Sequence, residues 1–405
     1  MKILVVCQYY YPENFQINTI CSDLVQRGHK VTVLTGLPNY PNGIIPEGYK
    51  HGNKRDEIID GVHIIRCFEV GRKKGIVGLA FNYFSYCISA AIRAKNKQFD
   101  FDVIYSYQLS PVTMVYPATI LKKKYKKQLL LYCCDLWPES MKVLLKGGNN
   151  ILFKVTAAIS KSLYNKCDKI AIQSPAFFEY FEKQHGIVHE KLCFIPQFAD
   201  SSYLNMSFRD VHEITNFVFL GNVGIAQDME CVLRAVKHIK DIQFRLHIVG
   251  DGSCLDNCKQ MVNEYSIEDK VIFYGRRPVD EMPKYYKLAD ACLITLKDDS
   301  MIGRTIPSKL QGYMAAGKVV IGAINGAAQD VIKEANCGLC VAASDDIALA
   351  EAMREFIINR KCYLNCGSNG REYFKKHFTK EIFMDNLEKK LKEMCDIDRY
   401  SRKLE

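Results

Sequence analysis

Hydrophobic positions in the first part of the chain form short uninterrupted runs, separated by stretches in which apolar residues recur every three or four positions. The first run, residues 2–7 (K-I-L-V-V-C), is typical of a strand buried on both faces of a parallel sheet. A helical pattern up to Arg27 and a second apolar run at residues 31–34 follow. This spacing gives the crossover length that two parallel strands need, so the chain begins with a strand–helix–strand unit.

The same alternation continues to about residue 195. Asp60-Gly61, at the centre of residues 58–70, indicates a β-hairpin. The pattern predicts further strands at residues 103–106, 129–133, 169–173 and 191–195, and helices from residue 111 and over residues 151–166 and 175–185.

A polar, irregular stretch at residues 199–213 interrupts this pattern, which then starts afresh. The restarted pattern predicts strands at residues 217–220, 244–249, 271–274, 291–296 and 318–324, with a helix over residues 228–239. Two successive series of alternating strands and helices predict an α/β protein with two Rossmann-like, doubly wound domains that face a central cleft. We place the domains and their connections at residues 1–199, a linker at 200–213, residues 214–380, and a C-terminal helix at 381–405 that could pack back on the first domain.

The composition is that of an ordinary soluble protein, with 48% apolar and 25% charged residues. No charged leader with an apolar signal core opens the sequence, so we expect a cytoplasmic location. Seventeen cysteines are scattered through apolar runs, which favours reduced core residues over disulfides. Cys254 and Cys258 form the nearest metal-like pattern, but no second pair stands at a suitable spacing, and we expect no metal.

The net charge of +10 lies entirely in the first 200 residues, which hold 26 Lys and Arg against 16 Asp and Glu. The remaining residues hold 29 of each sign. A one-sided basic domain indicates an anionic partner, either nucleic acid or an anionic membrane surface. The sequence lacks an interleaved aromatic and basic strand motif, so we expect the membrane and no nucleic acid.

Residues 76–92 are largely apolar, and basic residues flank them on both sides: Arg72, Lys73 and Lys74 before them, and Arg93, Lys95 and Lys97 after them. Their 17 residues fall short of the roughly 20 that a membrane-spanning helix needs. They fit an amphipathic helix on an anionic bilayer surface. A core helix of the first domain is an equally good interpretation.

The loops that follow strands in the second half are rich in glycine. Glycine lets the backbone approach a ligand closely, and loops at the carboxyl ends of parallel strands meet at one edge of the sheet. The candidate nucleotide-binding residues in these loops are Gly221, Asn222, Gly224, Gly250, Gly275, Arg276, Arg304, Thr305, Ser308 and Lys309.

Residues 303–317 (G-R-T-I-P-S-K-L-Q-G-Y-M-A-A-G) are predicted as a loop that enters a helix. Pro307 suits the first helical turn and Gly317 the position just past the end. The start of such a helix presents free N–H groups and partial positive charge to a phosphate, although an ordinary capped turn fits the same residues. Neither a G-x-G-x-x-G nor a P-loop motif is present, which disfavours a dinucleotide or a P-loop site.

In the first domain, Asp135 follows the strand at residues 129–133, and Glu139 lies about one helical turn later. These carboxylates could accept the proton of an acceptor hydroxyl or bind sugar hydroxyls, and we take both as candidate catalytic residues. Asp135 could instead cap the following turn. Asn14 and Asn18, at the start of the first long helix, are candidate substrate ligands or caps.

Several motifs in both halves together resemble a known enzyme family. They are Y-Y-Y-P-E-N at residues 9–14, R-G-H-K-V-T-V-L-T-G-L-P-N-Y-P at 27–41, D-L-W-P-E-S at 135–140, G-N-V-G at 221–224, V-G-D-G at 249–252 and P-S-K-L-Q-G-Y-M-A-A-G-K at 307–318. On these motifs the chain resembles GT-B glycosyltransferases of family 4, above all the bacterial sugar transferases of O-antigen and capsule assembly, such as fucosamine transferases.

The resemblance implies that the second domain binds a nucleotide-sugar, usually a UDP-sugar, with the base near residues 274–277. The diphosphate would lie between residues 221–224 and 305–309, where Lys309 would neutralise charge on the leaving group. No other cofactor is implied. Three positions depart from the family pattern: Arg304 and Gly312 replace its usual pair of glutamates, and Gln227 stands at the place of a lysine.

The resemblance therefore implies a cytoplasmic, membrane-associated glycosyltransferase that moves a sugar from a UDP donor to a polyprenyl-diphosphate-linked saccharide, with retention of configuration. A GT-B sugar-nucleotide epimerase that hydrolyses its substrate is the alternative enzyme. A two-lobed solute-binding protein is disfavoured by the missing signal sequence and the free cysteines.

Overall fold

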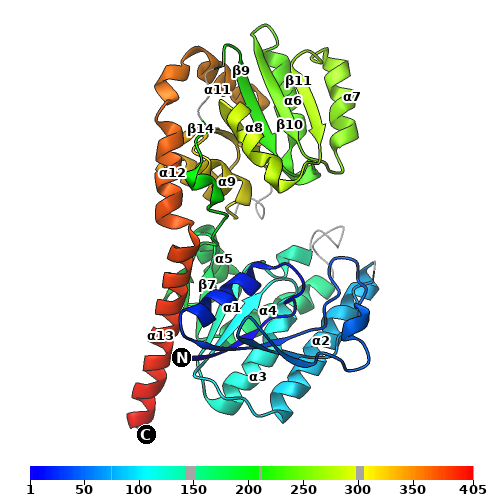
Figure 1. Ribbon diagram of the computed structural model, residues 1–405, viewed down its shortest axis with the longest axis vertical. Coiled ribbons are helices and arrows are strands. Elements are labelled where there is room, and N and C mark those ends of the chain that lie inside the picture. The colour runs from blue at the N-terminus through cyan, green and yellow to red at the C-terminus, as the bar shows by residue number, and fades with distance from the viewer. Residues whose placement is uncertain (74, 142–150, 209–211, 298–304, 405) are drawn as a thin grey trace. The chain divides into compact units, whose positions relative to one another are not determined.

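The computed structural model describes residues 1–73, 75–141, 151–208, 212–297 and 305–404, and their side chains up to residue 397. The chain divides into two compact units, and each unit has a parallel sheet with helices on both faces (Figure 1). The first unit consists of Met1–Gln173, Phe177–Ile195 and Met384–Glu405, and the second of Ser174–Ala176 and Pro196–Phe383.

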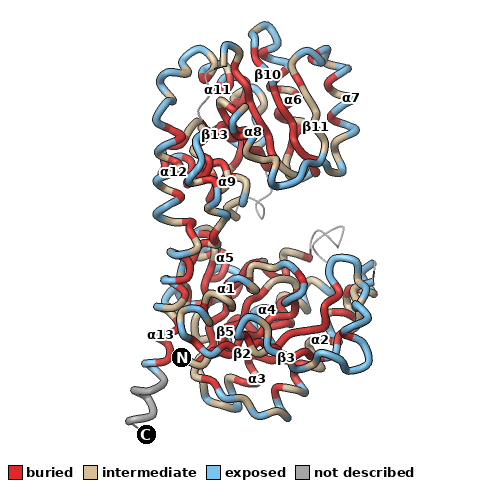
Figure 2. Tube along the Cα trace, in the orientation of Figure 1, coloured by how far each residue is buried: buried red, intermediate tan, exposed pale blue. Residues whose placement is uncertain are grey.

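The sheet of the first unit has eight strands in the order β3-β4-β2-β1-β5-β6-β7-β8. All neighbouring strands pair in parallel except β3, which is antiparallel to β4. The strands are mostly buried, as their red colour in Figure 2 shows, which accounts for their continuous apolar sequences. Their bounds are β1 (Lys2–Val6), β2 (Lys30–Thr35), β3 (Asp56–Ile59), β4 (Val62–Arg66), β5 (Val103–Gln108), β6 (Leu129–Cys133), β7 (Lys169–Ile172) and β8 (Leu192–Phe194).

The predicted hairpin is present and joins β3 to β4. Asp60 and Gly61 form its two-residue turn, with φ angles of 50° and 75°. These left-handed values suit the Asp-Gly pair, and they set Ile59 opposite Val62 across the two strands.

Within the described residues, helices α1 to α5 cover this sheet. In the first of them, Ile17, Ile20, Cys21 and Leu24 are buried, which is the spacing of a helix with one face against a core. The helix predicted from residue 111 begins later than expected, because a 3-10 turn occupies the residues before it. The helices are α1 (Gln16–Gln26), α2 (Ile76–Asn96), α3 (Tyr116–Tyr125), α4 (Ile151–Lys166) and α5 (Ala176–His185).

The last helix of the chain, α13 (Lys380–Leu404), belongs to the first unit from Met384 onward. Arg27 Nη1 lies 2.6 Å from Asp385 Oδ1 and 3.1 Å from Glu388 Oε2. His29 Nε2 lies 3.0 Å from Glu388 Oε1. These ion pairs join α13 to the end of α1, although the two segments are separated by more than 350 residues in the sequence.

The second unit has a six-stranded, entirely parallel sheet in the order β11-β10-β9-β12-β13-β14. The sequence pattern does not predict β14 or the helices α10 to α12, which the structure shows after residue 324. The strands are β9 (Thr215–Leu220), β10 (Phe244–Val249), β11 (Val271–Gly275), β12 (Ala291–Thr295), β13 (Val319–Ala323) and β14 (Gly338–Val341). The helices are α6 (Met229–His238), α7 (Leu255–Tyr265), α8 (Met282–Leu288), α9 (Ser308–Ala315), α10 (Ala327–Glu334), α11 (Asp346–Ile358) and α12 (Cys366–His377).

Two apolar clusters form the core of this unit, one on each face of its sheet. Phe217 and Phe219 of β9 belong to the cluster that includes α6 and α11. Val218 and Leu220 belong to the other cluster, which includes α9 and α12. Because successive side chains of one strand enter opposite clusters, both faces of β9 are covered by the core.

The observed division confirms the predicted α/β fold with two parallel-sheet domains. The boundary between the units follows Ile195, whereas the sequence pattern extends the first domain to residue 199. Residues 200–213 were predicted as a linker, yet Tyr203 and Phe208 pack into the core of the second unit. Within the described residues, this segment is therefore part of the second domain.

Candidate functional site

In the second unit, the glycine loops that follow β9, β10 and β11 contact one another through their backbones. The Gly221 N–H donates to Val249 O at 2.8 Å, and the Gly250 N–H donates to Gly275 O at 2.9 Å. The loops after β9, β10 and β11 therefore form one continuous surface at the carboxyl edge of the sheet, as the sequence predicts.

Two of these glycines are required by the close approach of the loops. A Cβ atom on Gly250 would lie 1.8 Å from the carbonyl oxygen of Gly221, which no side chain could tolerate. Gly221 and Gly250 also have φ angles of 124° and 154°, which L-residues rarely adopt. The backbone is thus left uncovered where a ligand could approach it.

Lys309 lies against the first glycine loop. Its Nζ donates to Asn222 O at 3.3 Å and lies 3.9 Å from the centre of the Phe219 ring. A Cβ on Gly221 would come within 2.6 Å of Lys309 Cε. Burial lowers the pKa of Lys309 to about 7, so the amine is poised to gain a proton when an anion binds beside it.

Gln227 closes the first glycine loop, a role that the sequence does not reveal. Its Oε1 accepts hydrogen bonds from the Gly224 N–H at 3.2 Å and from Asn222 Nδ2 at 2.9 Å. The Gly224 amide is therefore engaged by Gln227 and is not free for phosphate. Gly224 and Asn222 shape the loop, and the lysine expected at position 227 is replaced by a residue that holds it closed.

The start of α9 differs slightly from the prediction. Pro307 is the residue that precedes the helix, with φ −66° and ψ 138°, and it does not lie in the first turn. Ser308, the first residue of α9, is exposed, and Thr305, three residues before it, is half-buried. Gly317 lies just past the end of the helix, as predicted. Gly312 lies within α9, where a Cβ would meet the Tyr286 hydroxyl at 3.0 Å. Arg304 lies outside the described residues.

Gly275 and the exposed Arg276 follow Tyr274, the last large side chain of β11. The Tyr274 hydroxyl lies 3.0 Å from His247 Nδ1, and His247 Nε2 lies 2.9 Å from Asn216 Oδ1. Burial lowers the pKa of His247 to about 4, so the ring is neutral near pH 7. A neutral ring that donates from Nε2 to Asn216 accepts at Nδ1 from the tyrosine, which fixes Tyr274 in place.

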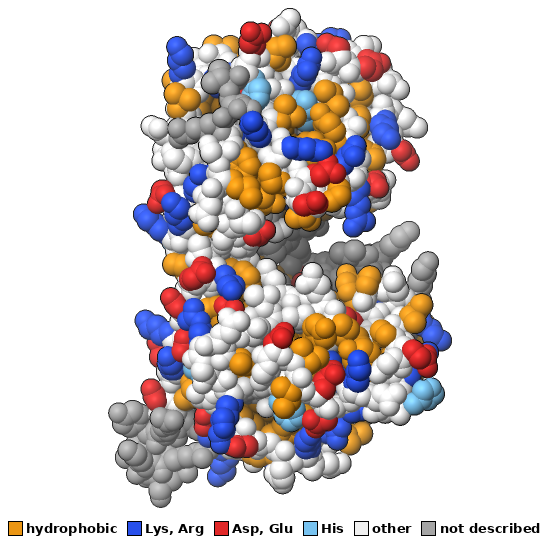
Figure 3. Space-filling view, viewed as in Figure 1, with side chains coloured by type: hydrophobic (Ala, Val, Ile, Leu, Met, Phe, Trp, Pro, Cys, Tyr) orange, Lys and Arg blue, Asp and Glu red, His pale blue; other side chains and the backbone are white. Residues whose placement is uncertain are grey.

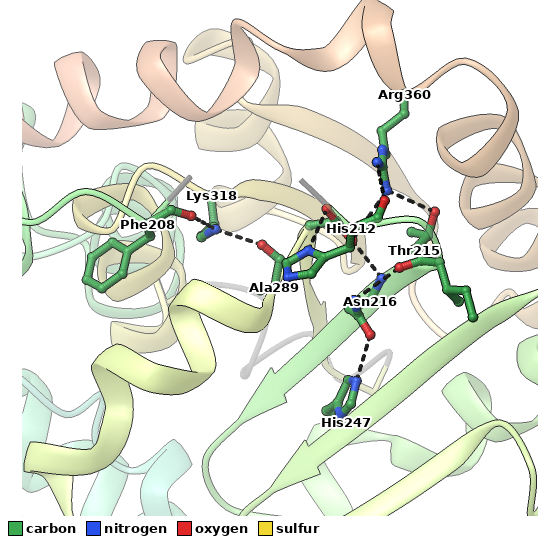
Figure 4. A network of polar contacts seen from close by, with 10 residues as sticks. Phe208, His212, Thr215, Asn216, His247, Ala289, Lys318 and Arg360 are labelled. Carbon is green, nitrogen blue, oxygen red and sulfur yellow. Dashed lines mark hydrogen bonds and ion pairs between the residues drawn. The ribbon is translucent and has the colours of Figure 1, made fainter. Parts of the chain in front are cut away.

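This hydrogen-bond chain continues to a buried network at the amino edge of the sheet (Figure 4). The Asn216 N–H donates to Asp290 Oδ2 at 2.8 Å, and Arg360 Nη1 lies 3.4 Å from the same oxygen. Nearby, Lys318 Nζ donates to the carbonyl oxygens of Phe208 and Ala289 at 2.6 and 2.7 Å. The network joins the starts of β9 and β12 to each other, and it gives the edge that faces away from the glycine loops a structural role.

Asp135 lies at the carboxyl edge of the first unit's sheet, directly after β6 and Cys134. Its carboxylate accepts a hydrogen bond from Ser110 Oγ at 2.6 Å, and Ser110 in turn accepts from Trp137 Nε1 at 3.1 Å. In the part of the chain that the structure describes, no backbone N–H of the following turn bonds this carboxylate, so Asp135 does not act as a cap. Burial raises the pKa of Asp135, which suits a general base.

Glu139 has a different environment from Asp135. Its Oε2 accepts a hydrogen bond from the Tyr180 hydroxyl. The same hydroxyl contacts Trp137 O and His185 Nε2, each at 3.1 Å. Glu139 is thus tied into a buried aromatic cluster, and the contact that the structure shows for it is structural.

Asn14 and Asn18 lie near β1, at the same edge of the sheet as Asp135. Asn14 is exposed, whereas Asn18 Nδ2 donates to Glu13 O at 2.6 Å. Phe15 occupies the N-cap position of α1, so neither asparagine caps this helix. Asn18 closes the loop that precedes α1, and Asn14 is the one of the two that solvent reaches.

A buried polar cluster at this edge was not found from the sequence. Gln8 Nε2 donates to Glu69 Oε1 at 2.7 Å, and Asn82 Nδ2 donates to the same oxygen at 2.6 Å. Burial raises the pKa of Glu69 to about 8, so this carboxyl is protonated at neutral pH. The cluster brings together β1, the β4–α2 loop and α2, and no local sequence pattern could reveal it.

Comparison with protein families gives the activity class. The model for Glycosyltransferase Family 4 matches residues 16–203, and the model for glycosyl transferases group 1 matches residues 211–373. This chain is a glycosyltransferase with the GT-B fold. The two matches fall one on each compact unit of the structure, up to a few residues at the boundary.

Curated relatives of the glycosyltransferase are distant in sequence. The glycosyltransferase WbjE of Pseudomonas aeruginosa is 24% identical over 332 residues, which cover 76% of this chain and 78% of WbjE. The N-acetyl-alpha-D-glucosaminyl L-malate synthase of Bacillus anthracis is 21% identical, with 90% of this chain and 89% of that protein covered.

Solved structures confirm the fold. The sucrose-phosphate synthase of Thermosynechococcus elongatus superposes with a TM-score of 0.71 at 17% identity, over 97% of this chain and 98% of that chain. Anabaena HepE, solved in complex with UDP and glucose, gives a TM-score of 0.67 at 16% identity, over 97% and 99% of the two chains.

Proposed function

We propose that this glycosyltransferase transfers a sugar from a UDP-sugar to a saccharide carried on polyprenyl diphosphate, with retention of configuration, in the assembly of a bacterial surface polysaccharide. The observation that carries the proposal is the position of Lys309 against the glycine loop at residues 221–224, at the start of α9.

The donor site follows from the charges at this place. The diphosphate of a nucleotide-sugar is anionic, and it would lie between the uncovered backbone of the glycine loops and the Lys309 amine. Binding of the anion raises the pKa of Lys309, and the resulting ammonium stabilises the diphosphate as it leaves. The start of α9 adds the partial positive charge of a helix N-terminus. Tyr274, held by His247, and Arg276 would lie beside the base.

The acceptor side of the proposal rests on Asp135. Its half-buried carboxylate accepts a hydrogen bond from Ser110 and can accept the proton of a sugar hydroxyl. A relative from Campylobacter jejuni, 26% identical over 213 residues, is named as an N-acetylgalactosaminyltransferase that acts on an undecaprenol-diphosphate-linked saccharide. WbjE and a colanic acid biosynthesis glycosyl transferase of Escherichia coli, WcaI, support a surface polysaccharide as the product.

The lipid-linked acceptor requires access to a membrane, and α2 provides a suitable surface. Among the described residues, α2 is the helix whose length and composition would allow it to cross a membrane, with 28% of its most apolar window buried. One face packs on the unit through Leu79, Tyr86, Ala90 and Ala94. The opposite face exposes an apolar stripe formed by Val77, Phe81, Phe84, Ile88 and Ile92.

This arrangement fits a helix that lies on the bilayer surface with its apolar stripe and packs its opposite face on the protein. Orange hydrophobic side chains also gather on the face of the first unit that Figure 3 shows. Arg72 and Lys73 precede α2, and Arg93 and Lys95 lie in its last turns, where they can contact anionic headgroups. We therefore place the enzyme on the inner face of the cytoplasmic membrane.

Incubation with a panel of UDP- and GDP-sugars and short lipid-diphosphate acceptors, followed by mass spectrometry, tests the proposal. We expect one UDP-sugar to extend a lipid-linked saccharide, and NMR of the product to show the anomeric configuration of the donor. Transfer from GDP-sugars alone would contradict the choice of donor. Release of UDP with an epimerised free sugar, without an acceptor, would favour the epimerase.

A further inference from the structure

Four basic side chains of the first unit lie together between the β3–β4 hairpin and the last turns of α2. A cavity of about 550 Å³ is lined there by Arg55, Arg66, Phe68, Ile92, Arg93 and Lys97, among others. β3 is the edge strand of the sheet, whereas Asp135 follows β6, four strands beyond β4. The cavity is therefore separate from the candidate catalytic residues.

Two of the four cations have partners that neutralise them. Lys97 Nζ lies 2.8 Å from Asp56 Oδ2. Arg66 pairs with Glu57, and its guanidinium lies 5.1 Å from the centre of the Tyr49 ring. Lys97 and Arg66 therefore stabilise the hairpin through its acidic residues Asp56 and Glu57.

Arg55 and Arg93 differ from them. Within the described ranges, no carboxylate pairs with either guanidinium, although both side chains are half-buried and line the same cavity. Burial lowers the pKa of Arg55, and the neighbouring charge of Arg93 lowers it further. Two like charges held together in a partly buried place repel each other, and a bound anion would relieve this cost.

The wall of the cavity is apolar on one side. Phe68 and Ile92 line it, and their side chains are 57% and 55% exposed. Ile92 also ends the exposed apolar stripe of α2, one turn after Ile88. The paired guanidinium groups therefore open directly onto the surface that we place on the membrane. A ligand that matches both features carries a phosphate next to an apolar chain.

We propose that this cavity binds the phosphate headgroup of an anionic phospholipid, with Arg55 and Arg93 as its ligands and with Phe68 and Ile92 beside the lipid's apolar part. Guanidinium groups suit this role because their planar N–H donors match two phosphate oxygens at once. The proposal rests on the membrane docking proposed above and adds a headgroup site to it. Free phosphate and the lipid diphosphate of the acceptor share the same chemistry.

The site can be tested with the full chain and a short-chain phosphatidylglycerol below its critical micelle concentration, titrated by calorimetry. We expect saturable binding that the double variant Arg55→Gln/Arg93→Gln weakens at least about tenfold, as the loss of two charge-assisted contacts implies. The double variant Lys123→Gln/Lys259→Gln removes the same charge from exposed positions outside α2 and should bind like the parent. Equal weakening in both variants would overturn the proposal, because it would show a general effect of charge.

A milder variant guards against loss of the fold. Arg93→Lys keeps the charge but loses the planar donor pair, so it should weaken phosphatidylglycerol binding while UDP binding and thermal unfolding match the parent. Full binding by Arg93→Lys, together with full binding by the glutamine double variant, would show that the cavity is not a headgroup site.

Two further ligands separate the sources of phosphate. Inorganic phosphate should bind at least about tenfold more weakly than phosphatidylglycerol, because it lacks the apolar contact. Equal affinity would overturn the lipid assignment. Tighter binding of farnesyl diphosphate would assign the cavity to the lipid diphosphate of the acceptor instead.

Sedimentation with anionic vesicles separates the headgroup site from the membrane docking of α2 on which the proposal rests. If the parent does not sediment with anionic vesicles but still binds phosphatidylglycerol monomers through Arg55 and Arg93, the docking surface is wrong and the headgroup site stands. If parent and glutamine double variant sediment equally and neither binds monomers, the docking surface stands and the headgroup site is wrong.

Discussion

The Lys309 amine lies 3.9 Å from the centre of the Phe219 ring, and its hydrogen bond goes to a backbone carbonyl. A ring face and a carbonyl stabilise a cation less than a carboxylate does, and burial accordingly holds the pKa of Lys309 at about 7. The charge of this residue is therefore available to the diphosphate of a donor.

We expect donor affinity to depend on pH through Lys309. Below its pKa of about 7 the free enzyme already carries the charge, and above it a proton must be taken up on binding, so affinity should fall up to about tenfold per pH unit. Calorimetry with a UDP-sugar between about pH 6 and about pH 8.5 measures this, since the charge of a diphosphate diester is constant there. Lys309→Arg should flatten the profile, and Lys309→Ala should lower turnover at least about tenfold. A parent-like rate in Lys309→Ala would place the diphosphate elsewhere.

Asp135 and Ser110 provide a second test. Asp135→Asn keeps a hydrogen-bond acceptor for Ser110 but loses the base, so the rate should fall by roughly 10²–10⁴ while the fold stays intact. The Ser110 hydrogen bond favours the ionised form of Asp135, so Ser110→Ala should raise its pKa further. The acid limb of kcat/KM should then move to higher pH. Near-normal activity in Asp135→Asn would assign the residue to structure.

Glu139 should behave differently from Asp135. Glu139→Gln keeps an oxygen that can accept the Tyr180 hydroxyl, so transfer activity should stay within about threefold of the parent. Tyr180→Phe, which leaves Glu139 without this donor, should lower the free energy of unfolding by about 1–3 kcal/mol with little change in kcat. Thermal unfolding and steady-state rates measure both effects. A loss in Glu139→Gln as large as in Asp135→Asn would make Glu139 a second catalytic carboxylate.

Two buried histidines predict a loss of stability in acid. Burial lowers the pKa of His185 and of His247 to about 4, against about 6.5 in an unfolded chain. The unfolded state therefore binds more protons between these values, and the free energy of unfolding should fall as the pH drops through this window. Each histidine contributes up to about 3 kcal/mol, which is fully present above about pH 6.5. Chemical denaturation at several pH values measures the slope, which His247→Asn should reduce. An unchanged slope in this variant would contradict the prediction.

The membrane surface of α2 can be tested by vesicle sedimentation. Phe84→Ser/Ile88→Ser removes two exposed apolar side chains from the stripe and should reduce binding to anionic vesicles at least about tenfold. A matched control, Ile347→Ser/Ile358→Ser, removes two exposed apolar side chains from the second unit and should bind like the parent. Salt should weaken the binding of the parent, because the basic residues around α2 act through screened charges. Equal sedimentation of the stripe variant and the control would contradict docking through α2.

The strands and the hairpin could be predicted because their signals are local. Residues 2–7 are apolar without interruption because both faces of β1 are covered, and Asp60-Gly61 adopts the two left-handed conformations of its turn. The glycine loops were predicted for the same reason, since each follows a strand whose carboxyl end faces the ligand edge.

Contacts between distant segments could not be predicted. Gln227 accepts a hydrogen bond from the Gly224 amide because the glycine loop folds back on the turn before α6. In the sequence, Gln227 is recognised only as a residue that stands where the family has a lysine. Ser110 meets Asp135 across neighbouring strands, 25 residues away in the chain. The sequence of residues 76–92 allows either a surface helix or a core helix, and α2 combines the two, with one face in the core and the other exposed.

The last helix has a consequence for synthesis of the protein. The first unit contains the chain's earliest strands, yet residues 384 onward belong to it, and Asp385 and Glu388 are the partners of Arg27 and His29. A ribosome has therefore made the whole second unit before the first can be completed. During that time the end of α1 lacks its acidic partners, and a fragment that stops at residue 195 would remain permanently in this state.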